Sequence, residues 1–170
     1  SSSLVGSEMC IRDSFYTAAV REFEDAGKPI IGSAPVGVEG TNSWIDSVGD
    51  TFNIAKKIIG DAKKKILPQI QKSLDDKKIN NKITVSGYEG SELIVARTLI
   101  EAGAEVPYVG TACPKTKWST EDKDWLESKG VFVKFRASLE DDISAVKSVN
   151  PDLAIGTTPV VQKAKELGIP

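Results

Sequence analysis

The stretch KITVSGYEGSELIVARTLIEAGAEVPYVGT, residues 82–111, decides the fold. An apolar strand around Ile83 and Val85 ends at a glycine-bearing turn, and helical spacing then runs from Ser91 to Ala102. Gly103 stands where a helix C-cap usually falls, and residues 106–109 predict a second strand. Strand, turn, helix and strand form a right-handed βαβ unit, and such units bind ligands at the carboxyl ends of their strands.

The same rhythm continues toward the C-terminus. Ser119 or Thr120 is expected to cap a helix that ends at Gly130, and Ser138 with Asp141 has close to capping-box spacing. The further strands are predicted at 131–135 and 153–155, and the last helix at 160–167. Short loops between alternating strands and helices predict an α/β fold, a Rossmann-like parallel sheet with helices on both faces. A βαβ repeat calls for another strand after residue 170, so we expect this domain to be truncated.

The chain before residue 82 is predicted to be mostly helical. A helix at 15–26 closed by Gly27, a strand at 29–32 and a loop at 33–40 should precede a helix capped by Thr41 or Asn42. Its amphipathic continuation is expected to break near Gly60 and Pro68 and to lead into a charged turn at 75–81.

Three divisions of the chain follow. Residues 1–14 contain LVGSEMCIRDS, which resembles translated sequencing-adapter read-through, and we expect them to be a non-native artefact in which Cys10 has no role. Residues 15–81 are expected to belong to a preceding α/β domain with connecting helices, and residues 82–170 to the incomplete Rossmann-like domain.

Composition excludes several classes of protein. Lys plus Arg number 22 against 24 Asp plus Glu, a net charge of −2, which argues against a nucleic acid as the partner. No apolar run approaches the ~20 residues of a membrane span, so we expect a soluble, cytoplasmic protein. The sequence has two cysteines and no histidine. This excludes Ser-His and Cys-His catalysis within it and argues against a disulfide framework or an internal zinc site.

The strand ends supply the candidate site residues. We expect the loops 33–41, 86–89, 111–113 and 157–158 to face a cavity between domains. The candidates for substrate binding are Ser86, Gly87, Thr111, Thr157 and Thr158, and the candidates for proton delivery are Glu89, Tyr88 and Cys113. No GxGxxG or Walker A pattern is present, so a dinucleotide or ATP site is not supported.

Plainer interpretations stay open for the same residues. For Gly87 and Gly90 a tight turn alone is the favoured interpretation, and for Cys113 a small buried side chain is the commoner case. Trp118 is most simply a core or interface aromatic. The turn Gly156-Thr157-Thr158-Pro159 either caps the following helix or binds a small anion at its N-terminus.

Four segments carry a resemblance to a known family. They are KPIIGSAPVGVEGTNSWI (28–45), PYVGTACPKTKW (107–118), KFRASLEDDISAV (134–146) and PDLAIGTTPVVQKAKELGIP (151–170). They resemble the Y-type subunits of chlorophyllide a reductases, within the nitrogenase-like component-one family that includes dark-operative protochlorophyllide reductase. The resemblance runs from about Phe15 to Pro170.

The resemblance implies an oxidoreductase that reduces the ring B double bond of chlorophyllide a in bacteriochlorophyll biosynthesis. It implies electrons from a transient, ATP-hydrolysing iron-sulfur protein, a 4Fe-4S cluster held with a Z subunit, and a heterotetramer. The cluster cysteines of the family lie in an N-terminal domain absent from this sequence, so no metal ligand is carried over and ATP is expected to bind the partner. The alternatives are another nitrogenase-like tetrapyrrole reductase and a non-catalytic Rossmann-like module for a small anion.

Overall fold

A computed structural model of the chain describes residues 20–31, 34–117 and 119–170. The chain divides into two compact units, Ser1–Gly32 and Ser33–Pro170. In the first unit, residues 20–25 are helical and Gly27 has a positive φ of 65°, as predicted for the residue that closes this helix. The predictions for residues 1–14 fall outside the described residues, and the predicted division at residue 81 stays a prediction.

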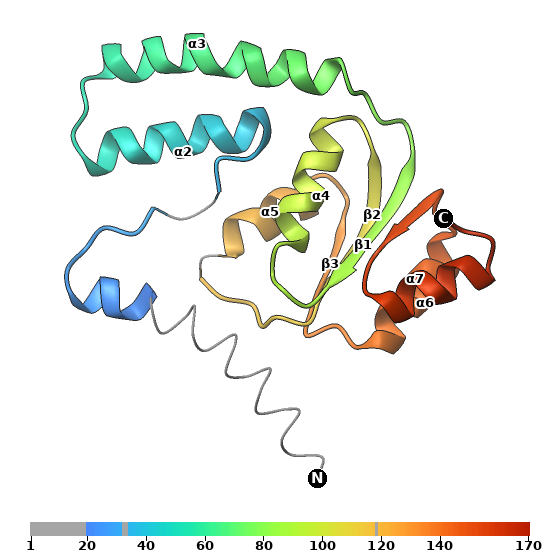
Figure 1. The fold of residues 1–170 in the computed structure, drawn as a ribbon. Coiled ribbons are helices and arrows are strands. Elements are labelled where there is room, and N and C mark those ends of the chain that lie inside the picture. Colours follow the sequence, from blue (N-terminus) through green and yellow to red (C-terminus); the bar gives the residue numbers. More distant parts are fainter. Residues whose placement is uncertain (1–19, 32–33, 118) are drawn as a thin grey trace. The chain divides into compact units, whose positions relative to one another are not determined.

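The second unit is built on a parallel sheet. Its strands are β1 (Lys82–Gly87), β2 (Glu105–Thr111), β3 (Phe132–Phe135) and β4 (Leu153–Ile155), in the order β3-β2-β1-β4. All three strand pairs are parallel (Figure 1). Val85 lies beside Val109 on one side and Ile155 on the other. The predicted α/β fold with a parallel sheet is therefore confirmed.

Helices cover both faces of this sheet. α4 (Glu92–Glu101) and α5 (Thr120–Ser128) pack on one face, and α6 (Leu139–Val149) and α7 (Thr158–Glu166) on the other (Figure 1). The larger apolar cluster joins β1 and β2 to α4 and α5, and its fully enclosed side chains include Val109 and Leu126. The smaller cluster joins α6, β4 and α7. The helices bury both faces of the sheet, and this burial stabilises it.

The helix ends largely follow local sequence signals. Ser138 and Asp141 form the predicted capping box, in which each side chain accepts a backbone N–H from the other residue. Gly103 and Gly130 have positive φ, as expected after α4 and α5. Ser119 is at the N-cap of α5, but its hydroxyl accepts the Thr116 N–H instead of a helix N–H. No helix in the described part of the chain combines the length and the apolar character needed to cross a membrane.

Two further helices, α2 (Gly37–Thr51) and α3 (Lys56–Asp75), precede the sheet and pack against each other. The strand predicted at 29–32 is wrong, since residues 29–31 have no regular structure and Gly32 lies outside the described residues. The loop predicted at 33–40 is too long and the caps at Thr41 and Asn42 are wrong, because α2 already begins at Gly37. A distant residue supports that start: the Val38 N–H donates to the Glu101 carboxylate of α4.

The predicted breaks at Gly60 and Pro68 are also wrong, because α3 runs through both. Pro68 cannot donate to the carbonyl of Lys64, and on a helix with no buried residue water can satisfy that carbonyl. The break comes at residues 52–55 instead. There Asn53 adopts the left-handed conformation, and the Ile54 N–H donates to the Gly49 carbonyl at 2.8 Å, so α2 ends in a Schellman motif.

Candidate functional site

A polar cleft lies where the strand order reverses. The chain runs from β1 outward to β2 and β3 and then returns to β4 on the other side of β1. Ligands of open α/β sheets bind at this switch point, outside the carboxyl ends of the strands. A cleft of about 430 Å³ is found there, lined by Ser86, Gly87, Tyr88, Glu89, Glu92, Gly156, Thr157, Thr158 and Pro159.

One wall of the cleft is the turn that follows β1. Tyr88 has an exposed fraction of 54% there, and Glu89 is also exposed. A side chain at Gly87 would force the Glu92 carboxylate to shift, because the Cβ would lie against its Oε1. The glycine that the sequence offered as a tight-turn residue therefore admits a carboxylate beside the end of β1.

Glu92, in the first turn of α4, is the buried acidic residue of the cleft. Its exposed fraction is 6%. One carboxylate oxygen, Oε1, accepts the backbone N–H of Glu89 at 3.0 Å. The other oxygen, Oε2, is buried and has no hydrogen-bond partner among the described residues. The acidic group is thus fixed at one oxygen and unpaired at the other.

The opposite wall is the turn from β4 into α7. Thr157 is the N-cap of α7 in an extended conformation, and its side chain makes no capping bond. Thr158 and Pro159 begin the helix, two residues before the predicted start at 160. The Ser86 hydroxyl donates to the Ile155 carbonyl at 3.5 Å and so connects the two walls at their base. Helix N-termini favour acceptor or anionic groups of a ligand.

A second buried carboxyl group lies near the same sheet edge. Asp142 of α6 has an exposed fraction of 6%, and the Tyr108 hydroxyl donates to its Oδ1 at 2.8 Å. Burial raises the pKa of Asp142, the Tyr108 hydrogen bond opposes that rise, and the charges of Asp141 and Glu92 add to it. Burial and then the Asp142 contact likewise raise the pKa of Tyr108. Gly110 makes room for this pair, since a Cβ there would clash with Asp142.

The structure brings together six of the eight predicted site residues in the cleft, and Thr111 and Cys113 are the exceptions. Thr111 is fully buried, and its hydroxyl accepts the Cys113 N–H at 3.2 Å, so it does not line the cleft. The Cys113 thiol donates to the Tyr88 carbonyl at 3.6 Å and ties the β2 turn to the β1 turn. Through these two hydrogen bonds, Thr111 and Cys113 stabilise the turn after β1 without lining the cleft.

The predicted loop 33–41 lies elsewhere. Ser33 is outside the described residues; α2 packs against α4, and Glu39 in its first turn contacts Trp125 of α5. The Trp125 indole N–H donates to Glu39 at 2.5 Å, and this bond, together with Lys129, lowers the pKa of Glu39. Trp118, expected to be a core or interface aromatic, also lies outside the described residues.

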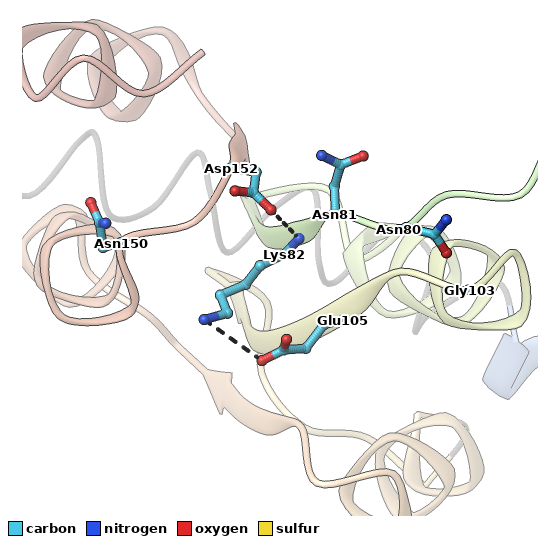
Figure 2. Close-up of a pocket in the computed structure, with 7 residues that line it drawn as sticks. All are labelled: Asn80, Asn81, Lys82, Gly103, Glu105, Asn150 and Asp152. Atoms are coloured by element: carbon cyan, nitrogen blue, oxygen red, sulfur yellow. Dashed lines mark hydrogen bonds and ion pairs between the residues drawn. The ribbon is translucent and has the colours of Figure 1, made fainter.

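A second hollow, of about 380 Å³, opens at the amino ends of the strands (Figure 2). Its side chains are amides and charged groups, and each charged residue contacts another residue of the hollow. The Lys82 N–H donates to Asp152 at 2.7 Å, and the Lys82 ammonium lies 3.9 Å from Glu105 (Figure 2). This edge is opposite to the one at which parallel sheets bind ligands, so the switch-point cleft is the better candidate.

Sequence reasoning missed Glu92 and Asp142. Each stands in the first turn of a helix, where an acidic residue is usual because it complements the helix dipole. The neighbouring glycines were a usable signal, since Gly87 and Gly110 near the ends of apolar strands leave space for a carboxylate.

The described residues do not fit an iron-sulfur cluster. Cys113 is the single cysteine among them, and they contain no group of three or more potential metal ligands. A 4Fe-4S cluster takes cysteine thiolates as ligands, usually four. Cys10 lies outside the described residues.

Comparison with known proteins identifies the family to which the chain belongs. The sequence model of the "Nitrogenase component 1 type Oxidoreductase" family matches residues 8–170. The "Chlorophyllide reductase 52.5 kDa chain" of Cereibacter sphaeroides is 60% identical over 156 residues, 92% of this chain, and that of Rhodobacter capsulatus is equally similar. The chain spans only 31% of the length of these relatives.

More distant matches agree with the fold. The "Light-independent protochlorophyllide reductase subunit N" of Prochlorococcus marinus is 25% identical over 146 residues, which cover 83% of this chain and 35% of that protein. The solved structure of nitrogenase Cp1 at pH 6.5 superimposes with a TM-score of 0.53 at 23% identity, over 79% of this chain and 30% of that one. At this identity the structural match supports the fold alone.

Proposed function

The chain belongs to the nitrogenase component 1 type oxidoreductases, and from that premise we propose that it is part of a chlorophyllide a reductase Y subunit. The complete enzyme would reduce the ring B double bond of chlorophyllide a in bacteriochlorophyll biosynthesis. The observation that carries the proposal is the 60% identity to two chlorophyllide reductase chains, against 25% to a protochlorophyllide reductase subunit. This contrast favours chlorophyllide over the related pigment.

The switch-point cleft is the proposed contribution of this chain to the pigment site. Its β1 wall offers Tyr88, Glu89 and the buried Glu92, and its α7 wall offers two threonines and a helix N-terminus. Acceptor groups of the pigment suit the α7 wall, and groups that exchange protons suit the β1 wall. Ser86 and Gly87 shape the base of the cleft between the walls.

The electron path would lie outside the described residues. An ATP-dependent iron-sulfur protein would supply the electrons, and a 4Fe-4S cluster held with the Z subunit would pass them to the pigment. Because the described residues do not fit the cluster, we assign none of them as a cluster ligand. ATP would bind the iron-sulfur protein, and the described segment would serve as scaffold and pigment wall.

The test is reconstitution of the complete enzyme. The full-length Y subunit, its Z subunit and the reduced iron-sulfur protein are mixed with ATP and chlorophyllide a, and the product is identified by absorption spectroscopy and mass. The proposal predicts a pigment two hydrogens heavier, formed only when both ATP and the iron-sulfur protein are present.

Two other outcomes would contradict the proposal. Reduction of protochlorophyllide with no action on chlorophyllide a would assign the chain to another tetrapyrrole reductase. Saturable phosphate or nucleotide binding by the complete subunit, with no pigment bound, would favour the small-anion module.

A further inference from the structure

Glu92 carries an unusual combination of burial and incomplete pairing. Among the acidic residues that line the switch-point cleft, Glu89 is exposed, whereas Glu92 is only 6% exposed. Buried polar atoms in folded proteins nearly always have a hydrogen-bond partner, and an exception calls for a physical explanation. The Oε2 atom of Glu92 is such an exception among the described residues.

The surrounding backbone holds this carboxyl group in place. The Glu89 N–H donates to Oε1 at 3.0 Å, which fixes one oxygen within the turn itself. Gly87 leaves the space that the group occupies beside the strand end. The arrangement therefore holds a carboxyl group at the wall of the cleft, with its second oxygen buried and without a hydrogen-bond partner among the described residues.

A reduction of a carbon-carbon double bond needs protons as well as electrons. The chain has no histidine, so a proton donor within it must come from another residue type, and carboxyl groups are common general acids. Of the candidates named from the sequence, Tyr88 and Glu89 are exposed to solvent and the Cys113 thiol is directed to the Tyr88 carbonyl. Glu92 is the buried carboxyl group in contact with the cleft.

We propose that Glu92 is the residue whose carboxyl group delivers a proton to the pigment during reduction. This inference rests on the proposed function, because it takes the bound molecule to be chlorophyllide. Two electrons arrive from the iron-sulfur protein, the Glu92 O–H bond breaks, and a C–H bond forms on ring B. The electron pair of the broken bond stays on the carboxylate, solvent supplies the proton of the second C–H bond, and solvent then reprotonates Glu92.

The test compares two variants of Glu92 in the complete reconstituted enzyme. Glu92→Gln keeps the shape and an oxygen for the Glu89 N–H but carries no transferable acid proton, and Glu92→Asp keeps a carboxyl group on a shorter side chain. General acids contribute about 10²–10⁴-fold, so kcat of Glu92→Gln should fall by at least about a hundredfold. Its Kd for chlorophyllide should stay close to wild type, and Glu92→Asp should recover part of kcat.

The matched control is Glu105→Gln, which makes the same carboxyl-to-amide replacement at the opposite edge of the sheet. It should leave both kcat and Kd unchanged. Thermal unfolding of each variant is measured in parallel.

Two results would overturn the inference. Wild-type turnover by Glu92→Gln would exclude proton delivery from this side chain. Loss of pigment binding in both Glu92 variants, with lowered unfolding temperatures, would assign Glu92 a purely structural role. Failure of the proposed function is distinct from these, because the wild-type enzyme itself would then leave chlorophyllide a unreduced.

Discussion

At the scale of single residues, two buried ionisable pairs carry most of the unusual chemistry of the second unit. Asp142 accepts from Tyr108 at the carboxyl edge of the sheet, and Arg97 lies 2.5 Å from Asp122 between α4 and α5. A charge removed from water is costly unless it is paired, so each pair should respond strongly to loss of one partner.

Asp142 should make the chain less stable as pH rises. Its pKa is raised in the folded state, mainly by burial, so its carboxyl group binds a proton more tightly when folded than when unfolded. This contribution to stability is fully present below the unfolded pKa of about 4 and is lost as pH rises through the folded pKa. Asp142→Asn keeps an acceptor for Tyr108 but does not titrate.

The measurement is the unfolding free energy of wild type and Asp142→Asn in urea across a pH series. The difference between the two should shift in favour of the variant as pH rises from about 4, and then level off. A difference that is constant over the whole series would show that Asp142 titrates normally in the folded chain.

The Arg97 pair predicts a large loss of stability. Arg97 is 3% exposed and also lies 4.7 Å from the ring centre of Trp125. Arg97→Met would leave Asp122 as an unpaired buried charge, which costs about 3–5 kcal/mol of unfolding free energy. The control, Lys163→Met, removes an exposed pair with Glu166 and should change stability by less than about 1 kcal/mol. Equal effects of the two substitutions would contradict the account.

At the scale of elements, the start of α2 depends on a residue far along the chain. Gly37 has φ +64°, and the adjacent Val38 N–H donates to Glu101 of α4. A side chain at Gly37 would both strain the backbone and clash with that carboxylate. The local sequence predicted a later start because a capping group that lies in another helix leaves no signal nearby.

Gly37→Ala should therefore destabilise the chain. The left-handed conformation alone costs a non-glycine residue about 1–2 kcal/mol, and the clash with Glu101 adds to it. Gly60→Ala, in the middle of α3 with no atom near its Cβ position, should instead stabilise by up to about 1 kcal/mol. The check is urea unfolding of both variants, and a stabilising Gly37→Ala would refute the described start of α2.

At the scale of the whole molecule, the sequence predicted the part of the fold that repeats. The parallel sheet and its helices were predicted from strand periodicity, the C-cap glycines and the Ser138 capping box. These signals could be identified because each acts within a few residues. The contact of Glu101 with the start of α2 could not be predicted, because the two residues are far apart in the sequence. The continuity of α3 through Pro68 was also missed. Strand order was likewise not readable, although it places the switch point between β1 and β4.

The candidate site was likewise predicted only where local signals mark it. The turns that end β1 and β4 were identified from strand ends, and they meet in one cleft. Thr111, also at a strand end, is buried because the strand continues through it and its hydroxyl turns back to Cys113. Glu92 was missed because its burial depends on Gly87 and on the Glu89 turn, which only the folded backbone brings together.

We propose that this chain is part of an enzyme that reduces chlorophyllide a. The most direct measurement is kcat/KM of the complete, reconstituted enzyme for chlorophyllide a and for protochlorophyllide under identical conditions of ATP and iron-sulfur protein. The account predicts ATP-dependent reduction of chlorophyllide a with a kcat/KM well above that for protochlorophyllide. A preference for protochlorophyllide, or no reduction of either pigment, would contradict it.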